Sequence, residues 1–289
     1  MADAASGWAA VFDHAADSYD REQLSFFDAH ADSLIAQIGP RPGERVLDVA
    51  TGTGKVALRA ADAVGVGGSV VGVDVSTSML RIARGKATAA PIRFCIMDAR
   101  DLAFRDGSFD VAACAFGLTF MRPRIVDGVR ELGRIVRPGG RVAIATFVEE
   151  AFSPLLEPFL SALEGVGVPR SARPRPRWTL LDRERYVARV LRSGGLSHRR
   201  VIRAAAGTTL REIDDFWVLL RGSAWRSALR WLSPEASARV RDELQRRFED
   251  LRGPDGVRLD TSALIGTGVR VGSRTPRTFG WISTSGRSA

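Results

Sequence analysis

Residues 46–55 of this 289-residue chain, VLDVATGTGK, restrict its possible folds more than any other stretch. Val46 to Val49 have the apolar character of a short buried strand, and a loop with Gly52 and Gly54 follows at once. Apolar residues at helical spacing then run from Val56 to Val64. Glycines let a ligand approach the backbone where a side chain would block it. A strand, a glycine loop and a helix in this order open a nucleotide-type ligand site in an α/β protein.

Asp48 lies just before the glycine loop. A carboxylate there repels a pyrophosphate but suits a cofactor that carries positive charge. The loop itself formally matches the dinucleotide pattern G-x-G-x-x-G/A, and Asp74 follows at a suitable distance to accept hydrogen bonds from two ribose hydroxyls. The glycines and Asp74 therefore leave both NAD and another adenosine-containing cofactor open.

Apolar runs alternate with helical patterns along most of the chain. The runs predict strands at Arg45–Ala50, Ser69–Asp74, Ile92–Met97, Phe109–Ala115, Arg141–Phe147, His198–Ala206 and Thr261–Val269. Helices fill the gaps, with Ser76 and Thr77 capping the second and Ile125 to Val136 forming the fourth. We therefore expect an α/β fold with a doubly wound, Rossmann-like, seven-stranded and mostly parallel sheet.

The chain divides into four parts on the same patterns. Residues 1–40 predict an N-terminal helical lid, and residues 41–150 predict the Rossmann-like core. Residues 151–270 predict a helical cap and the completion of the sheet, and 271–289 predict a disordered tail rich in Arg, Ser, Thr and Gly. The helices expected after residue 150 are Ser153–Glu164, Asp182–Arg192, Leu210–Leu220, Ala224–Trp231 and Pro234–Leu251.

The net charge of +9 raises the question of nucleic-acid binding. Lys55 and Lys86 are the only lysines, so nearly all the positive charge is arginine, as in proteins from GC-rich genomes. A Pro-interleaved cluster at 170–177 has no aromatic ladder beside it, which makes nucleic acid an improbable partner. A solvated loop, or a site for an anionic substrate group, explains the cluster better.

Two cysteines, Cys95 and Cys114, fall inside apolar runs and predict buried thiols rather than a disulfide or a metal site. No apolar run is long enough to span a bilayer, and Met1 to Ser6 do not resemble a signal peptide. We expect a cytoplasmic protein with no metal, no membrane partner, and a homodimer as one oligomeric option.

Four motifs together resemble those of class I S-adenosylmethionine-dependent methyltransferases, in particular the ubiquinone/menaquinone C-methyltransferase-like (methyltransferase type 11) group. They are VLDVATGTG at 46–54, GVDVS at 72–76 with Met79-Leu80, MDA at 97–99 and RPGG at 137–140. The resemblance extends over roughly residues 8–150 and is far more specific than a single glycine loop.

The resemblance implies S-adenosyl-L-methionine as cofactor, held by Tyr19, Asp48, Ala50, Gly52, Gly54, Asp74, Val75, Met79, Asp98, Ala99, Ala115 and Phe116. This cofactor carries a sulfonium, an ammonium and one carboxylate, so charge pairing with Asp48 near its methionyl end favours it over NAD. Asp74 would bind the ribose diol and Met79 the adenine face, although plain core packing also explains Met79. Asp98 would accept from the adenine amino group while the Ala99 N–H donates to the ring; the alternative for Asp98 is a cap on the turn 99–103.

Methyl transfer is an in-line displacement that mainly needs alignment and exclusion of water. A base is required only if the acceptor is a poorly acidic hydroxyl or carbon. The candidates for catalysis are His14, Tyr19 and Glu149, with a solvated loop carboxylate as the alternative for Glu149 and a surface position on the lid helix as the alternative for Tyr19. His198, at the wrong end of a strand, is expected to be structural.

The run AFGLTFM at 115–121 lacks the Asn/Asp-Pro-Pro-Tyr/Phe signature of enzymes that methylate amino groups of nucleic acids and glutamine. Its apolar character favours a hydrophobic small molecule. The candidate substrate contacts are Phe12, Phe120, Trp178 and Trp217, with Phe216 and Trp225 as further cap residues, and core packing is the alternative for each cap residue.

These patterns predict a methyltransferase that methylates carbon or oxygen of a quinone-like or secondary-metabolite acceptor. Three alternatives stay open at this point. The first is an RNA or protein methyltransferase, the second a NAD-dependent oxidoreductase, and the third a relative that keeps the cofactor without transferring its methyl group.

Overall fold

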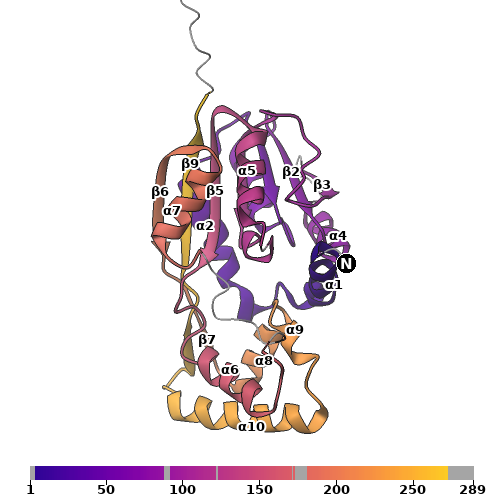
Figure 1. Ribbon diagram of the computed structural model, residues 1–289, viewed down its shortest axis with the longest axis vertical. Helices are drawn as coiled ribbons and strands as arrows, with labels where there is room; N and C mark the ends of the chain where they lie inside the picture. The colour runs from indigo at the N-terminus through magenta and orange to yellow at the C-terminus, as the bar shows by residue number, and fades with distance from the viewer. Residues whose placement is uncertain (1–3, 88–91, 122, 171, 173–180, 273–289) are drawn as a thin grey trace, which may run out of the picture.

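The computed structural model describes residues 4–87, 92–121, 123–170, 172 and 181–272. A seven-stranded sheet with the order β3-β2-β1-β4-β5-β9-β6 forms its centre (Figure 1). Its strands are β1 (Arg45–Val49), β2 (Ser69–Asp74), β3 (Ile92–Ile96), β4 (Phe109–Ala115), β5 (Val136–Phe147), β6 (Leu196–Ala204) and β9 (Ala263–Arg270). Strands β1 to β5 pair in parallel, and β9 runs antiparallel to both β5 and β6. The predicted α/β fold with a mostly parallel, seven-stranded sheet is confirmed.

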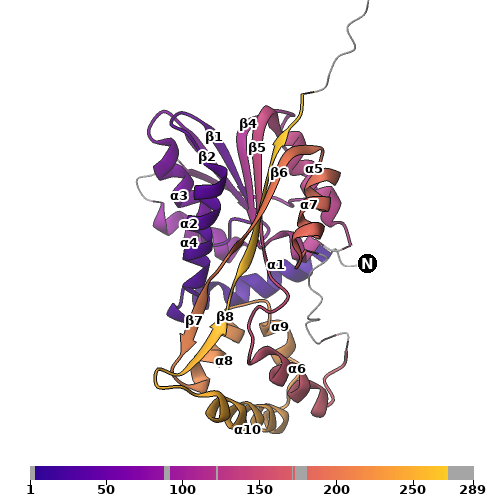
Figure 2. The ribbon, with the colours of Figure 1, turned by 90° about the vertical axis from the view of Figure 1, so that its left-hand side faces the viewer.

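Helices cover both faces of this sheet, as its buried central strands require. Helices α2 (Phe26–Ile38), α3 (Lys55–Val64) and α4 (Thr77–Lys86) lie on one face, and α5 (Ile125–Ile135) and α7 (Glu184–Ser193) lie on the other (Figure 2). Ser76 caps α4 as expected, because its hydroxyl accepts a hydrogen bond from the Met79 N–H at 3.1 Å.

A second lobe lies beyond the carboxyl ends of the parallel strands (Figures 1 and 2). We call this lobe the cap; it consists of α6 (Leu156–Gly165), β7 (Gly207–Leu210), α8 (Ile213–Arg221), α9 (Arg226–Leu229), α10 (Pro234–Leu251) and β8 (Val257–Asp260). Strands β7 and β8 form a separate antiparallel pair that the sequence did not predict. Helix α10 buries Val240, Leu244 and Phe248 at helical spacing, which anchors it to the rest of the lobe.

The chain before α2 runs between the sheet and the cap. It contains helix α1 (Ala4–Ala15) and the short 3-10 turns η1 (Ala16–Ser18) and η2 (Glu22–Leu24), and we call residues 4–25 the N-terminal segment. Helix α2, in contrast, packs against the sheet, with Ala31, Leu34 and Ile38 buried. Of the described residues 4–40, the N-terminal segment therefore lies over the strand ends and α2 does not.

The structure also bears on what the sequence predicted for the two cysteines, for the tail and arginine cluster, and for membrane-spanning segments. The prediction of a buried thiol is right for Cys114 on the central strand β4 but wrong for Cys95, which is exposed because β3 is an edge strand. Most of the tail from 271 and of the arginine cluster at 170–177 falls outside the described residues. In the part of the chain that the structure describes, no helix has both the length and the apolar character needed to cross a membrane.

Candidate active site

A cavity with about 1190 Å³ of empty space, its open mouth included, lies where the sheet, the N-terminal segment and the cap meet. Its floor consists of loops that follow β1, β2, β3 and β4, which is the usual ligand position in an open parallel sheet.

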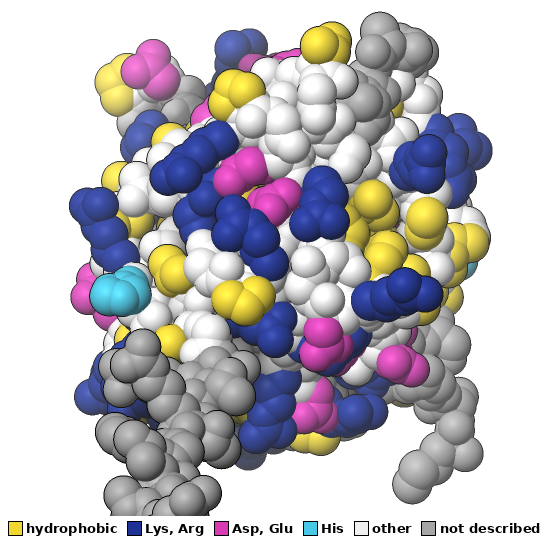
Figure 3. All heavy atoms as spheres, turned by 90° about the horizontal axis from the view of Figure 1, so that it is seen from above, with side chains coloured by type: hydrophobic (Ala, Val, Ile, Leu, Met, Phe, Trp, Pro, Cys, Tyr) yellow, Lys and Arg dark blue, Asp and Glu magenta, His cyan; other side chains and the backbone are white. Residues whose placement is uncertain are grey.

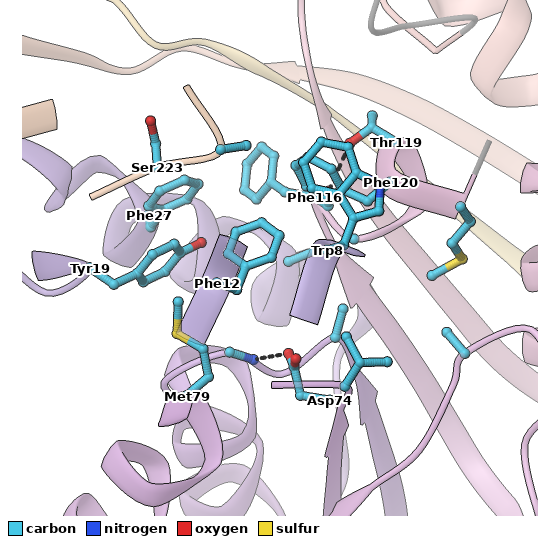
Figure 4. A pocket seen from close by; sticks show the side chains of 18 of the residues that line it. Trp8, Phe12, Tyr19, Phe27, Asp74, Met79, Phe116, Thr119, Phe120 and Ser223 are labelled. Carbon is cyan, nitrogen blue, oxygen red and sulfur yellow. Dashed lines mark hydrogen bonds between the residues drawn. The ribbon is translucent and has the colours of Figure 1, made fainter. Parts of the chain in front are cut away.

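The polar end of the cavity is the glycine loop after β1 together with the end of β2. Gly52 has a φ of +54° and no atom within 4 Å of the position that a Cβ would take. Its N–H donates to Asp74 Oδ2 at 2.9 Å (Figure 4). The Ser76 N–H donates to Oδ1 at 2.9 Å. Burial raises the pKa of Asp74, although these two donors oppose that effect. The Asp74 carboxylate is therefore held in one orientation at the cavity wall, next to the Gly52 backbone, which no side chain covers.

Asp98 and Ala99 border the same end, and Met79 reaches it from α4 (Figure 4). Arg100 holds the Asp98 carboxylate, with Nε 3.0 Å from Oδ1 and Nη2 2.5 Å from Oδ2, while the Arg100 N–H donates to Oδ1 at 2.9 Å. These bonds from Arg100 lower the pKa of Asp98. Asp98 is thus both ionised and oriented, and a carboxylate has further lone pairs with which to accept a ligand amino group.

Asp48 does not line the cavity, contrary to the expected pairing with the methionyl end. It is 1% exposed, and its Oδ2 accepts from Thr51 Oγ1 at 2.6 Å and from the Ala57 N–H at 3.0 Å. The Ala57 N–H belongs to the first turn of α3, so the carboxylate occupies the anion position at that helix N-terminus. Burial raises the pKa of Asp48 to about 7. Its carboxyl group therefore supports the glycine loop and the first turn of α3 rather than contacting a ligand.

The other end of the cavity is aromatic. Trp8 and Phe12 of α1 meet Phe120 from the turn η3 (Leu118–Met121), with ring centroids 4.8 and 5.1 Å from that of Phe120 (Figure 4). Tyr19 stacks on Phe27 at 5.2 Å, and its hydroxyl points into the cavity. These side chains form an apolar surface in the cavity that Asp74 also lines.

The sequence missed several residues of this aromatic end. Phe26, Phe147 and Phe152 line the cavity from α2, β5 and the loop after β5. Trp225, which the sequence offered as a cap residue of the pocket, lines it from the loop before α9. Behind them lies His30, which is 1% exposed and has Nε2 2.7 Å from the Thr261 carbonyl oxygen. The helical spacing of Phe27, Ala31 and Leu34 was visible in the sequence, but the side of the sheet that α2 covers was not.

Of the twelve predicted cofactor residues, ten line the cavity and two do not. Tyr19, Ala50, Gly52, Asp74, Val75, Met79, Asp98, Ala99, Ala115 and Phe116 line it, and their contacts with a cofactor stay predictions. Asp48 and Gly54 do not, because Gly54 is the N-cap of α3 and its Cα lies against Ala83 of α4.

The structure does not bring two of the catalytic candidates to the cavity. His14 lies on the exposed side of α1, where Nδ1 is 2.7 Å from the Ala10 carbonyl oxygen. Glu149 is exposed and pairs with Arg183 at 2.6 Å. Tyr19 alone among the three lines the cavity, and burial, with help from the charges of Asp74 and Asp20, raises its pKa.

Among the predicted substrate residues, Phe12 and Phe120 line the cavity. Trp217 is buried in the cap, with the Arg241 guanidinium 5.4 Å from its ring centre, and does not reach the cavity. Phe216 is also core, packed on Phe159. Trp178 lies outside the described residues.

Polar bonds fasten the N-terminal segment to the glycine loop and to the cap. Asp20 Oδ1 lies 3.2 Å from Lys55 Nζ and accepts from Thr53 Oγ1 at 2.9 Å, and its other oxygen pairs with Lys86. Although burial opposes ionisation, the bonds from Lys86 and Thr53 keep the pKa of Asp20 below its usual value. On the cap side, Gln23 Nε2 donates to Asp215 Oδ1 at 2.7 Å. Tyr19 is therefore held in place by its neighbour Asp20.

We expect Asp20→Ala to lower the affinity for S-adenosylmethionine by about 3- to 10-fold, since a partly buried charge-assisted network is lost. The change also leaves Lys86 without its carboxylate partner and Lys55 with Asp28 alone, beside a site for a cationic ligand. Titration calorimetry measures the effect. Asp17→Ala is the matched control, because Asp17 is an 86% exposed carboxylate that pairs with Arg81 on the outside of the same segment. Equal affinities in the two variants would show that the Asp20 network does not support the site.

We also expect Asp48→Asn to change the pH dependence of stability. A carboxyl whose pKa is raised to about 7 by burial keeps its proton in the folded state between about pH 4 and 7, where the unfolded chain has lost it. The folded state therefore binds more protons, and the wild-type free energy of unfolding falls as the pH rises through that window, by at most about 1.4 kcal/mol per pH unit. Subtracting the Asp48→Asn curve from the wild-type curve in urea unfolding at pH 5, 6, 7 and 8 isolates this contribution. Parallel curves would contradict it.

Comparison with protein families matches residues 46–140 to a methyltransferase domain. A demethylmenaquinone methyltransferase from Beutenbergia cavernae is 41% identical over 122 residues, which cover 42% of this chain and 48% of that protein. A nocamycin O-methyltransferase from Saccharothrix syringae is 35% identical over 137 residues, which cover 46% of this chain and 49% of that protein. The chain thus spans about half the length of the curated relatives that it matches.

Among solved structures, the YcgJ protein from Bacillus subtilis has a TM-score of 0.54 and 19% sequence identity. The match covers 84% of this chain and 98% of that one. At this identity the match supports the fold, and it extends past the segment that the family model covers.

Proposed function

We propose that this chain, whose residues 46–140 match a methyltransferase domain, uses S-adenosylmethionine to methylate carbon or oxygen of a hydrophobic small molecule. The observation that supports the proposal is that a polar end and an aromatic end meet in one cavity. Gly52, Asp74 and Asp98 border one end, and an aromatic surface around Phe120 borders the other. A methyl donor and an apolar acceptor can meet only where two such ends adjoin.

The polar end fits S-adenosylmethionine on its own chemistry. The open space over Gly52 admits a ligand against the backbone, and the carboxylate of Asp74 suits the ribose diol. Met79 offers an apolar, polarisable surface for the adenine, and Asp98 an acceptor for its amino group. When bound, the cofactor supplies an electrophilic methyl group on a positively charged sulfur.

The position of Asp48 argues against NAD. A dinucleotide places its pyrophosphate at the N-terminus of the helix after the glycine loop. Here the Asp48 carboxylate already accepts from the Ala57 N–H at that place. A pyrophosphate would have to displace the Asp48 carboxyl group from this N–H, whereas a cofactor without phosphate would not.

The apolar end supports a small molecule rather than an RNA or a protein as acceptor. Trp8, Phe12 and Phe120 line the cavity in mutual contact, and Trp225 borders it from the cap, so this end offers an acceptor aromatic surface rather than charged groups. On the face at the amino ends of the strands, basic side chains are dispersed among acidic and uncharged ones rather than gathered in a groove (Figure 3). Quinone-like and other secondary-metabolite acceptors have the apolar, flat shape that such a surface suits.

In the reaction, the residues of this chain position and enclose rather than react. The aromatic side chains exclude water and align the acceptor with the methyl group, which is the main requirement of an in-line displacement. Tyr19 keeps its proton and can donate a hydrogen bond into the cavity. The two thiols, both free, support our proposal of a cytoplasmic location.

Titration calorimetry with S-adenosylmethionine and, separately, NADH tests the cofactor. We expect micromolar binding of the first and no measurable binding of the second, and the opposite result would overturn the proposal. Radiolabelled methyl transfer to a panel of hydroquinones, naphthols and aliphatic alcohols then tests the activity. Tight cofactor binding without transfer to any member would favour a relative that keeps the cofactor for another purpose.

A further inference from the structure

The chain has few side chains that can take a proton near neutral pH, and the structure accounts for them. Its three histidines are His14, exposed on α1, His30, bonded to the Thr261 carbonyl, and His198, exposed on the edge strand β6. Its two lysines, Lys55 and Lys86, both pair with Asp20 beneath the glycine loop. None of these five side chains lines the cavity as the structure describes it.

The cysteines and the glutamates of the nearby loop are equally remote. Cys95 is exposed on β3 and Cys114 is fully buried in β4. Glu149 pairs with Arg183, and Glu150 lies 3.6 Å from Arg203 on β6. In the described part of the cavity wall, the ionisable side chains are those of Tyr19, Asp74, Asp98 and Arg100.

Each of these four groups belongs to the cofactor end or is in the wrong state to remove a proton. Two backbone N–H groups fix Asp74 at the proposed ribose site, and the bonds from Arg100 lower the pKa of Asp98, which makes it a weak base. Tyr19 is protonated, since burial and the charges of Asp74 and Asp20 raise its pKa, and a phenol that holds its proton is a donor. The guanidinium of Arg100 is a cation throughout.

The hydroxyls at the aromatic end are also bonded to backbone. Thr119 Oγ1 donates to the Phe116 carbonyl at 3.1 Å, and Ser223 Oγ donates to the Leu220 carbonyl at 3.3 Å. The residues that the structure leaves undescribed add little, because by sequence Asp3 is the single Asp, Glu, His, Lys, Cys or Tyr among them.

From this census we propose that the acceptor brings its own negative charge: it is a flat, acidic phenol or enol that enters as the anion, and the enzyme supplies no base. The inference rests on the proposed methyltransferase function and names the acceptor class. Phenols have an acidic O–H, and β-dicarbonyl compounds have an acidic C–H or enol O–H, so both classes form such anions. Aliphatic alcohols, whose hydroxyls stay protonated at neutral pH, are excluded.

The reaction balances without a proton leaving the acceptor inside the cavity. The anionic oxygen, or the enolate carbon, gives an electron pair to the methyl carbon while the carbon–sulfur bond breaks and the sulfur keeps its pair. One negative and one positive charge disappear together. The apolar wall around Phe120 and Trp225 strips water from the anion, which raises its reactivity and makes its binding depend on the nearby positive charge.

Binding of 4-nitrophenol, whose anion absorbs visible light and whose neutral form does not, tests the proposal without turnover. Its apparent pKa on the enzyme is measured with sinefungin, which has an ammonium in place of the sulfonium, and with the uncharged S-adenosylhomocysteine. We expect the pKa of the bound phenol to be lower by about 1 to 3 units with sinefungin, as for an acid beside an opposite charge. Equal pKa values, a neutral bound phenol with sinefungin, or failure of the phenol to bind would each overturn the proposal.

A pH series gives the second measurement. In the series phenol, 4-nitrophenol and 2,4-dinitrophenol, the midpoint of the pH profile of kcat/KM should fall as the acceptor becomes more acidic. Tyr19→Phe should reduce the rate but leave this midpoint unchanged. One common midpoint for all three, or its loss in His14→Gln or Glu149→Gln, would assign a base to the enzyme and refute the inference. Failure of S-adenosylmethionine to bind in calorimetry would instead refute the proposed function, so the two failures are distinguishable.

Discussion

Replacing Gly52 with valine is expected to lower the affinity for S-adenosylmethionine by about 100-fold or more, equal to roughly 2.7 kcal/mol. Gly52 has a φ of +54°, a region that a β-branched residue avoids, and a Cβ at this position would extend into the open space of the cavity. The new side chain would stand where the cofactor must approach the backbone. Titration calorimetry, with circular dichroism to verify folding, measures the loss.

Gly39 provides a matched control for the backbone strain. Its φ is +56°, its Cβ position is equally free of neighbours, and it is the C-cap of α2, away from the cavity. Gly39→Val should therefore reduce the melting temperature about as much as Gly52→Val while cofactor affinity stays near that of the wild type. If both variants lose affinity alike, the effect comes from stability and Gly52 is not part of the cofactor site.

The sheet could be predicted because its signals are local. Strands β2 and β4 begin and end at the predicted residues, since each is a continuous apolar run with turn residues on both sides. Strands β7 and β8 could not be predicted, because each has four residues and they pair across almost fifty positions of sequence. The polar stretch Gly207–Leu210 becomes a strand only through that distant partner.

The candidate site likewise contains residues that a local sequence pattern predicts and residues that it does not. Gly52, Asp74 and Asp98 follow strands in the sequence, so a motif places them at one edge of a parallel sheet. Phe152 reaches the cavity only because the chain folds back over that edge toward the cap, which no local pattern records. Such contacts depend on the packing of whole elements rather than on spacing.

The catalytic candidates failed for a different reason. His14 lies two positions from Phe12, so on a helix it points away from the cavity that Phe12 lines. Glu149 follows β5 at the correct end of the sheet, but Arg183 before α7 pairs with it at the surface. A sequence identifies residues with the required chemistry, and tertiary partners decide which of them remain available.

Asp74→Ala is expected to lower the affinity for S-adenosylmethionine by about 10- to 100-fold, through the loss of two charge-assisted bonds to the ribose hydroxyls. The same change removes the acceptor that fixes the Gly52 N–H at 2.9 Å, so the glycine loop also loses a restraint. Asp74→Asn keeps one side-chain oxygen and should fall between the wild type and Asp74→Ala. Calorimetric titration of the three proteins with S-adenosylmethionine measures the order.

Asp110→Ala separates the ribose contact from a general effect of losing a structural carboxylate. Asp110 accepts from the Arg45 N–H at 2.8 Å and from Arg137 Nε at 2.6 Å, at the start of β4 and hence at the opposite edge of the sheet. Both aspartates therefore tie backbone to a strand end, but only Asp74 lines the cavity. The Asp110 variant should lose stability and keep its cofactor affinity. An unchanged affinity in Asp74→Ala would remove the ribose assignment, and with it the strongest polar contact that the proposed cofactor would make.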